Sequence, residues 1–290
     1  MDATDAKPRW WSRARRERPH RTLKMPPGTL LHDPEAPPPI VTVFGFSPES
    51  YVEECVKSAL ELPEFLRRWP TAWVNVDGLG DAGAIAAVGE IFGVHRLALE
   101  DVLHVVQRSK VETYEDKLYI VARMPEMKDE ERLDSEQFSL FLGRGWVLTF
   151  QERPGDCFDN IRDRIRHKRG RVRDAGADYL AYALLDSLTD SYFPILEKIG
   201  ERLEDLEDEI VETTGRELVA SVHDLKRDLL TVRRAMWPQR EALNTLVRDR
   251  NELIRDETRM YLRDLYDHTI QLIDLTETHR EVCADLMDLY

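Results

Sequence analysis

The stretch that decides the fold is YLRDLYDHTIQLIDLTETHREVCADLMDLY, residues 261–290. Its apolar residues recur at helical spacing, and Leu265, Leu272 and Leu286 are separated by multiples of seven. This spacing predicts one long helix with an apolar stripe, and a sustained period of seven is typical of helices packed side by side around an axis. We expect the apolar stripe to pack against partner helices and to serve as the seam between them.

A second stripe on the same segment is acidic and repeats every seven residues. It consists of Asp267, Asp274, Glu281 and Asp288. Because it shares the period of the apolar stripe, it keeps one constant direction along a supercoil. Two interpretations stay open at this point. The acidic stripe is either the solvated outer face of an amphipathic helix or the wall of a funnel lined by several copies, with Asp288 as its narrowest ring of carboxylates.

Composition limits the classes of protein that the chain can belong to. The 290 residues include 41 Lys and Arg against 55 Asp and Glu, a formal net charge of −14, which disfavours nucleic acid as a partner and suits cations. The three cysteines show no CxxC spacing, and no secretory leader is present, which indicates a reduced, cytosolic protein. The sequence contains no run of 18 apolar residues and so predicts no membrane-spanning helix. We therefore expect the chain as written to be soluble.

Strand and helix patterns alternate irregularly over the first half of the chain. Predicted strands are IVTVFGF (40–46), TAWVNVDG (71–78), KLYIVARM (117–124), EQFSLFLG (136–143) and WVLTFQE (146–152). Predicted helices are DAGAIAAVGEIFG (81–93), opened by Asp81, and LALEDVLHVV (97–106). The pattern lacks strict βαβ alternation, so it favours an α+β fold: an N-terminal mixed-sheet α/β sandwich followed by long C-terminal helices that form a stalk or funnel.

We predict three segments along the chain. Residues 1–38 are a disordered basic tail, residues 39–170 the α/β domain and residues 171–290 the long-helix stalk domain. The basic cluster RDRIRHKRGRVR (162–173) lacks interleaved aromatic residues, so we interpret it as a solvated helix end and linker.

The pattern of the second half of the chain predicts helices. We predict helices over 179–212 and 217–248, a break at Thr213-Thr214-Gly215 and a kink at Pro238. The stretch EKIGERLEDLEDEIVE (197–212) is so acidic that cations or a basic partner would have to compensate its charge.

No arrangement of residues indicates an enzyme. The cysteines lack a histidine partner in any recognisable pattern, and no GxSxG motif, Walker loop or Rossmann loop is present. THREV around His279 is not an HExxH motif, and we interpret His268 as a packing or surface residue.

Four long stretches resemble the CorA family of magnesium transport proteins. They are LALEDVLHVVQRSKVETYEDKLYIV (97–121), QERPGDCFDNIRDRIRHKRGRVRDAGADYLAYALLDSLTDSYFPILEKI (151–199), KRDLLTVRRAMWPQRE (226–241) and YLRDLYDHTIQLIDLTET (261–278). The resemblance implies a homopentamer with α/β domains at the cytoplasmic face of the cell membrane and one long helix per subunit forming a funnel towards the pore. The sequence stops at Tyr290, where the pore helix would begin, and lacks the two membrane helices and the Gly-Met-Asn signature. We therefore expect the cytosolic domain of such a channel, linked to the membrane through a following segment and weakly associated without it.

The resemblance also implies metal ligands between neighbouring subunits. They are Glu100 and Asp101 from the α/β domain, Asp264 on the long helix and Asp186 as a further candidate. Mg²⁺ prefers oxygen ligands and keeps much of its water shell, so one or two carboxylates suffice for a weak site. The expected function is a divalent-cation sensor in which bound Mg²⁺ favours the closed pentamer, with Co²⁺ or Ni²⁺ as alternative ions. Two other functions remain: a domain of a cobalt/nickel or zinc transporter of the same superfamily, and a helical scaffold with no role in ion binding.

Overall fold

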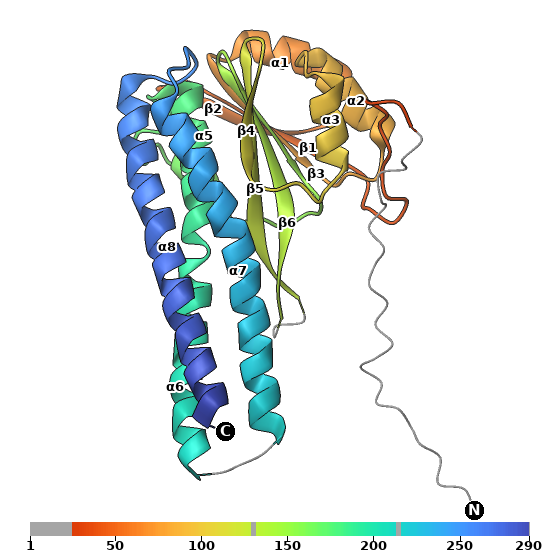
Figure 1. The fold of residues 1–290 in the computed structure, drawn as a ribbon. Helices are drawn as coiled ribbons and strands as arrows, with labels where there is room; N and C mark the ends of the chain where they lie inside the picture. Colours follow the sequence, from red (N-terminus) through yellow and green to blue (C-terminus); the bar gives the residue numbers. More distant parts are fainter. Residues whose placement is uncertain (1–24, 129–131, 213–215, 290) are drawn as a thin grey trace, which may run out of the picture.

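A computed structural model describes residues 25–128, 132–212 and 216–289. The described residues form a mixed sheet of seven strands with helices on both faces, and the last three helices of the chain extend well beyond the sheet (Figure 1). This architecture confirms the predicted α+β fold class. Among the described residues, no helix is both long enough and apolar enough to cross a bilayer.

The sheet has the strand order β2-β1-β3-β7-β6-β5-β4. The strands are β1 (Ile40–Phe46), β2 (Tyr51–Val56), β3 (Thr71–Asp77), β4 (Lys110–Tyr114), β5 (Lys117–Lys128), β6 (Arg132–Gly143) and β7 (Trp146–Gln151). Neighbouring strands pair antiparallel except β3 and β7, which run parallel with Trp73 opposite Val147. Gly145 has a φ of 82° in the tight turn between β6 and β7, a conformation that glycine adopts without steric cost.

Shorter helices surround the sheet. They are a 3₁₀ turn η2 (Ala59–Glu61), α1 (Leu62–Arg68), α2 (Ala82–Ile91), α3 (Arg96–Leu103) and α4 (Asp159–Arg166). The predicted start of α2 is confirmed, because the Asp81 carboxylate accepts hydrogen bonds from the backbone N–H groups of Gly83 and Ala84. One face of the sheet packs against α2 and α3, with Leu99 and Tyr119 in that core.

Four further helices lie on the opposite face of the sheet. These are α5 (Gly176–Asp190), α6 (Phe193–Glu212), α7 (Arg216–Arg248) and α8 (Asp256–Leu289). Of these, α5 and α7 contact the strands, and α6 and α8 pack against the other helices. A single apolar core runs from Trp73 in the sheet through Leu184 of α5 to Leu286 near the end of α8. The boundary that we predicted at residue 170 falls between α4 and α5, and because the core is continuous across it, that boundary stays a prediction.

Several predicted details need correction. The helix predicted over 179–212 is two helices, because the chain turns at Ser191 and Tyr192. The basic cluster at 162–173 is less solvated than predicted: Arg162 pairs with the Asp156 carboxylate and lies over the Trp73 ring, and Arg173 is 8% exposed. The predicted basic tail falls largely on residues 1–24 and the predicted break on residues 213–215, both outside the described residues.

The apolar stripe of α8 is buried inside its own chain. Leu265 and Leu272 are fully buried and Leu286 nearly so, in the core shared with the other long helices. The stripe therefore packs against partner helices as predicted, and these partners are α5, α6 and α7 of the same chain. A contact between copies through α8 would use another face of this helix.

Candidate metal centre

Acidic side chains and one imidazole meet where α5 and α8 lie side by side (Figure 1). Asp186 and Asp190 lie one helical turn apart on α5, and Asp264 and His268 lie one turn apart on α8. One potential ligand atom each from Asp186, Asp190 and His268 falls within 4.8 Å of the other two. His268 Nε2 also lies 3.8 Å from an Asp264 carboxylate oxygen. We call these four residues the α5–α8 cluster.

The carboxylates of this cluster destabilise one another's charge. Burial and the neighbouring Asp190 raise the pKa of Asp186 to about 6, and His268 and a hydrogen bond from Tyr182 offset only part of this rise. Burial also raises the pKa of Asp190, and Asp264 adds to the rise. A cation among these oxygens would reverse both effects, because it favours the ionised carboxylates.

His268 presents an unused nitrogen to the same site. Its Nδ1 is buried without a hydrogen-bond partner among the described residues, and lies 3.8 Å from an Asp190 oxygen. Carboxylate oxygens suit Mg²⁺, whereas an imidazole beside them suits Co²⁺, Ni²⁺ or Zn²⁺. The spacing of the cluster fits a cation that retains part of its water shell.

The two remaining predicted ligands lie on α3 and have partners in their own chain. Asp101 accepts hydrogen bonds from Lys110 Nζ at 2.6 Å and from Gln107 Nε2 at 3.0 Å. Glu100 accepts one from the backbone N–H of Gly28 at 2.6 Å. Burial opposes the charge of Lys110, but its bonds to Asp101 and Glu112 outweigh this and raise the pKa of Lys110. A metal approaching Asp101 would therefore compete with Lys110 for the carboxylate.

The structure brings together only half of the predicted metal ligands. Asp186 and Asp264 share the α5–α8 cluster, while Glu100 and Asp101 lie on a helix that packs against the other face of the sheet (Figure 1). Sequence reasoning missed Asp190 and assigned His268 to packing or the surface. The spacing of four residues between Asp186 and Asp190, and between Asp264 and His268, was the signal that could have identified both.

The acidic stripe of α8 lies on the side opposite the apolar one. Its members are all exposed: Asp267, Asp274, Glu281 and Asp288. In a single copy it is therefore a solvated face, and its direction in an assembly stays a prediction.

Comparison with solved structures shows that the fold occurs in other proteins. The structure of the soluble domain of CorA from Methanocaldococcus jannaschii superposes with a TM-score of 0.73 at 22% identity, over 86% of this chain and 95% of that one. The ZntB cytoplasmic domain from Vibrio parahaemolyticus superposes with a TM-score of 0.69 at 15% identity, with the same coverage of both chains. At these identities the likeness establishes the fold alone.

Sequence comparison establishes the family. The model of the CorA-like Mg²⁺ transporter protein family matches residues 71–290. The cobalt/magnesium transport protein CorA of Thermotoga maritima is 42% identical over 268 residues, which are 92% of this chain and 76% of that protein. The chain belongs to the CorA-like Mg²⁺ transporter family.

Proposed function

We propose that this chain is the cytosolic, divalent-cation-sensing domain of a CorA-type Mg²⁺ transporter. Support comes first from family membership and from the relative in Thermotoga maritima, which is named a cobalt/magnesium transport protein. In this proposal the domain lies at the cytoplasmic face of the membrane, and bound Mg²⁺ holds neighbouring copies of a homopentamer in the closed arrangement.

The observation that carries the proposal is the separation of the predicted ligands. Asp264 and Asp101 lie on opposite sides of the sheet, so one copy cannot bring both to the same ion. A second copy can, if its α3 faces the α5–α8 cluster of the first. Lys110 leaves Asp101 only partly neutralised, since it also bonds Glu112, so Asp101 can still approach an ion through bridging water.

Simple magnitudes favour a sensor built from several weak sites. At a free ion concentration of ten times the Kd, one site stabilises the bound state by about 1.4 kcal/mol. Moving a switch from 1:99 to 99:1 requires about 5.5 kcal/mol. Five equivalent sites supply about 7 kcal/mol if the open state binds no ion, so a ring of copies suffices where a single copy does not.

The proposal also assigns a function to the acidic stripe of α8. We infer that Asp267, Asp274, Glu281 and Asp288 face the central axis of the ring and concentrate cations there. The apolar stripe is used within the chain, and so the exposed acidic face is what α8 presents to its neighbours. Contact between copies would then depend on cations to screen the facing carboxylates.

The test is the thermal response of the chain to Mg²⁺. We expect millimolar Mg²⁺ to raise the melting temperature and the sedimentation mass together. The variant E100A/D101A/D264A should lose both responses. A control with the same change of charge, E204A/E207A/D208A on exposed positions of α6, should keep them. A full response in the first variant would mean that these residues do not form the site.

One observation favours Co²⁺ or Ni²⁺ as the ion that the domain senses. His268 adds a nitrogen ligand that Mg²⁺ rarely uses, so the α5–α8 cluster also fits a domain that senses Co²⁺ or Ni²⁺. Comparing the midpoints of thermal stabilisation for these ions and for Mg²⁺ distinguishes the two proposals.

A further inference from the structure

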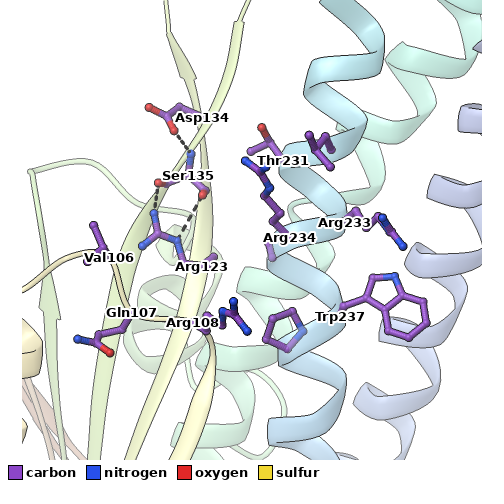
Figure 2. Close-up of a pocket in the computed structure, with 13 residues that line it drawn as sticks. Val106, Gln107, Arg108, Arg123, Asp134, Ser135, Thr231, Arg233, Arg234 and Trp237 are labelled. Atoms are coloured by element: carbon purple, nitrogen blue, oxygen red, sulfur yellow. Dashed lines mark hydrogen bonds between the residues drawn. The ribbon is translucent and has the colours of Figure 1, made fainter. Parts of the chain in front are cut away.

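A groove of about 890 Å³ lies between α7 and the sheet, away from the α5–α8 cluster (Figure 2). It exists because β4 pairs with β5 only as far as Val121, so the rest of β5 has no strand beside it on that side among the described residues. The loop between α3 and β4 forms one wall, Arg123 of β5 with Asp134 and Ser135 of β6 the second, and α7 the third.

The groove is basic although the chain is acidic. Four arginines line it against the single carboxylate of Asp134, in a chain of formal charge −14. One of the four, Arg233, pairs with Glu277 of α8 at 2.9 Å and points towards that helix in Figure 2. The remaining three cations of the groove are Arg108, Arg123 and Arg234.

Arg123 is a fixed cation on the sheet side. It is 8% exposed, and its guanidinium donates to the carbonyl of Val105 at 3.0 Å and to the carbonyl of Ser135. Its own carbonyl accepts a hydrogen bond from the buried Tyr192 hydroxyl at 2.8 Å. Backbone and side chain are therefore both held in place, and the charge cannot move away from the groove.

Arg108 and Arg234 complete the set from the other two walls. Both are exposed, and in the part of the chain that the structure describes neither guanidinium makes an ion pair or a hydrogen bond. Like charges that line one groove repel one another, and an anion between them converts that repulsion into attraction. Long flexible arginines on two walls beside a fixed one can close around such an anion.

We propose that this groove binds a phosphate-bearing small molecule. The planar guanidinium fork matches the oxygens of phosphate in bidentate fashion, which a single lysine charge cannot do. The volume lies within the range of small-molecule sites and exceeds what one carboxylate needs, so it suits a di- or triphosphate group. The arginines of this anion site are not among the residues of the proposed cation sensor, although Gln107 of the groove donates to Asp101.

Binding should be measured without divalent ions, because Gln107 beside Arg108 donates to Asp101, a proposed metal ligand. The probes are inorganic triphosphate and ATP, titrated calorimetrically into the 290-residue chain in EDTA. We expect saturable binding that weakens as salt is raised. R108A and R234A should each weaken it about tenfold or more, since charge-assisted hydrogen bonds are lost.

The matched control is R248A, an exposed arginine further along α7 and outside the groove. It removes the same charge and should bind triphosphate like the parent, and unchanged melting temperatures show that all variants fold. Equal binding by R108A, R234A and R248A would overturn the proposal, as would no binding of either probe at millimolar concentration. Binding of an acidic peptide with the sequence of residues 204–212, without binding of phosphate, would overturn it in favour of a protein partner.

Discussion

The Asp178 carboxylate at the start of α5 holds the residue that precedes α8. Its Oδ1 lies 2.7 Å from Arg255 Nη2, and its Oδ2 accepts the backbone N–H of Arg255 at 3.0 Å. The hydroxyl of Thr258, 2% exposed, donates to the same carboxylate at 2.6 Å. One buried carboxylate thus fixes where α8 begins relative to the sheet.

Replacing Asp178 should destabilise the fold substantially. D178A leaves the buried Thr258 hydroxyl and the Arg255 N–H without their acceptor, so we expect the free energy of unfolding to fall by about 2–4 kcal/mol. Urea unfolding measures this loss. The control D256A removes a fully exposed carboxylate next to Arg255 and should cost far less than D178A. Similar losses in the two variants would contradict the assigned role.

Replacing His268 should weaken stabilisation by Co²⁺ more than stabilisation by Mg²⁺. H268A removes the nitrogen ligand and leaves the carboxylates, so the midpoint of thermal stabilisation by Co²⁺ should weaken about tenfold while that by Mg²⁺ changes little. H223A, at an exposed position of α7, is the matched control and should change neither. An equal loss for both ions would show that His268 supports the fold of the site and does not select the metal.

Glu136 should make stability depend on pH. Burial, with repulsion from Glu152 and Glu126, raises the pKa of Glu136 from 4.5 to about 8. Between pH 4.5 and about pH 8 the Glu136 carboxyl is therefore protonated in the folded state and ionised in the unfolded state. Stability is therefore expected to fall as pH rises from about 4.5 to about 8.

The variant E136Q removes this dependence. At pH 8.5 we expect it to be about 1–3 kcal/mol more stable than the parent, and at pH 4.5 the difference should be small, since both side chains are then neutral. Urea unfolding at the two pH values gives the comparison. E90Q, at an exposed position of α2, should match the parent at both. A difference between E136Q and the parent that does not change with pH would refute the assignment.

The direction of the acidic stripe can be tested by cross-linking. With the exposed Cys55 replaced by serine, D274C should form disulfides between copies in Mg²⁺, because a stripe that faces the axis brings identical positions together. D208C, exposed on α6, should cross-link much less. The reverse order of efficiency would place the stripe on the outside of the assembly. Gel mobility without reducing agent is the measurement.

Periodic segments were predicted well because their burial follows directly from their pattern. The strand at 40–46 is confirmed to the residue, and the helix opened by Asp81 begins where its cap predicts. β2 and β4 were missed, because their side chains are mostly exposed or half-buried and so lack the apolar alternation of the inner strands.

The candidate site was predictable only in part. A seven-residue period locates the two faces of α8 but does not say which helix covers the apolar one, because that depends on the turn at Ser191 and Tyr192 and on packing against α7. The meeting of His268 with Asp190 depends on the same packing. Spacing in the sequence puts each pair on one face, and only the tertiary structure puts the two faces together.

The parallel pairing of β3 with β7 has a consequence for the order in which the chain can fold during synthesis. β1, β2 and β3 can form an antiparallel unit as soon as Asp77 has left the ribosome, but Thr71–Asp77 then presents an unpaired edge until Gln151 has been added. An unpaired, apolar strand edge is prone to associate with other chains. The nascent chain therefore passes through a window of about 70 residues in which chaperone binding would be most useful, and slowing translation there should increase aggregation.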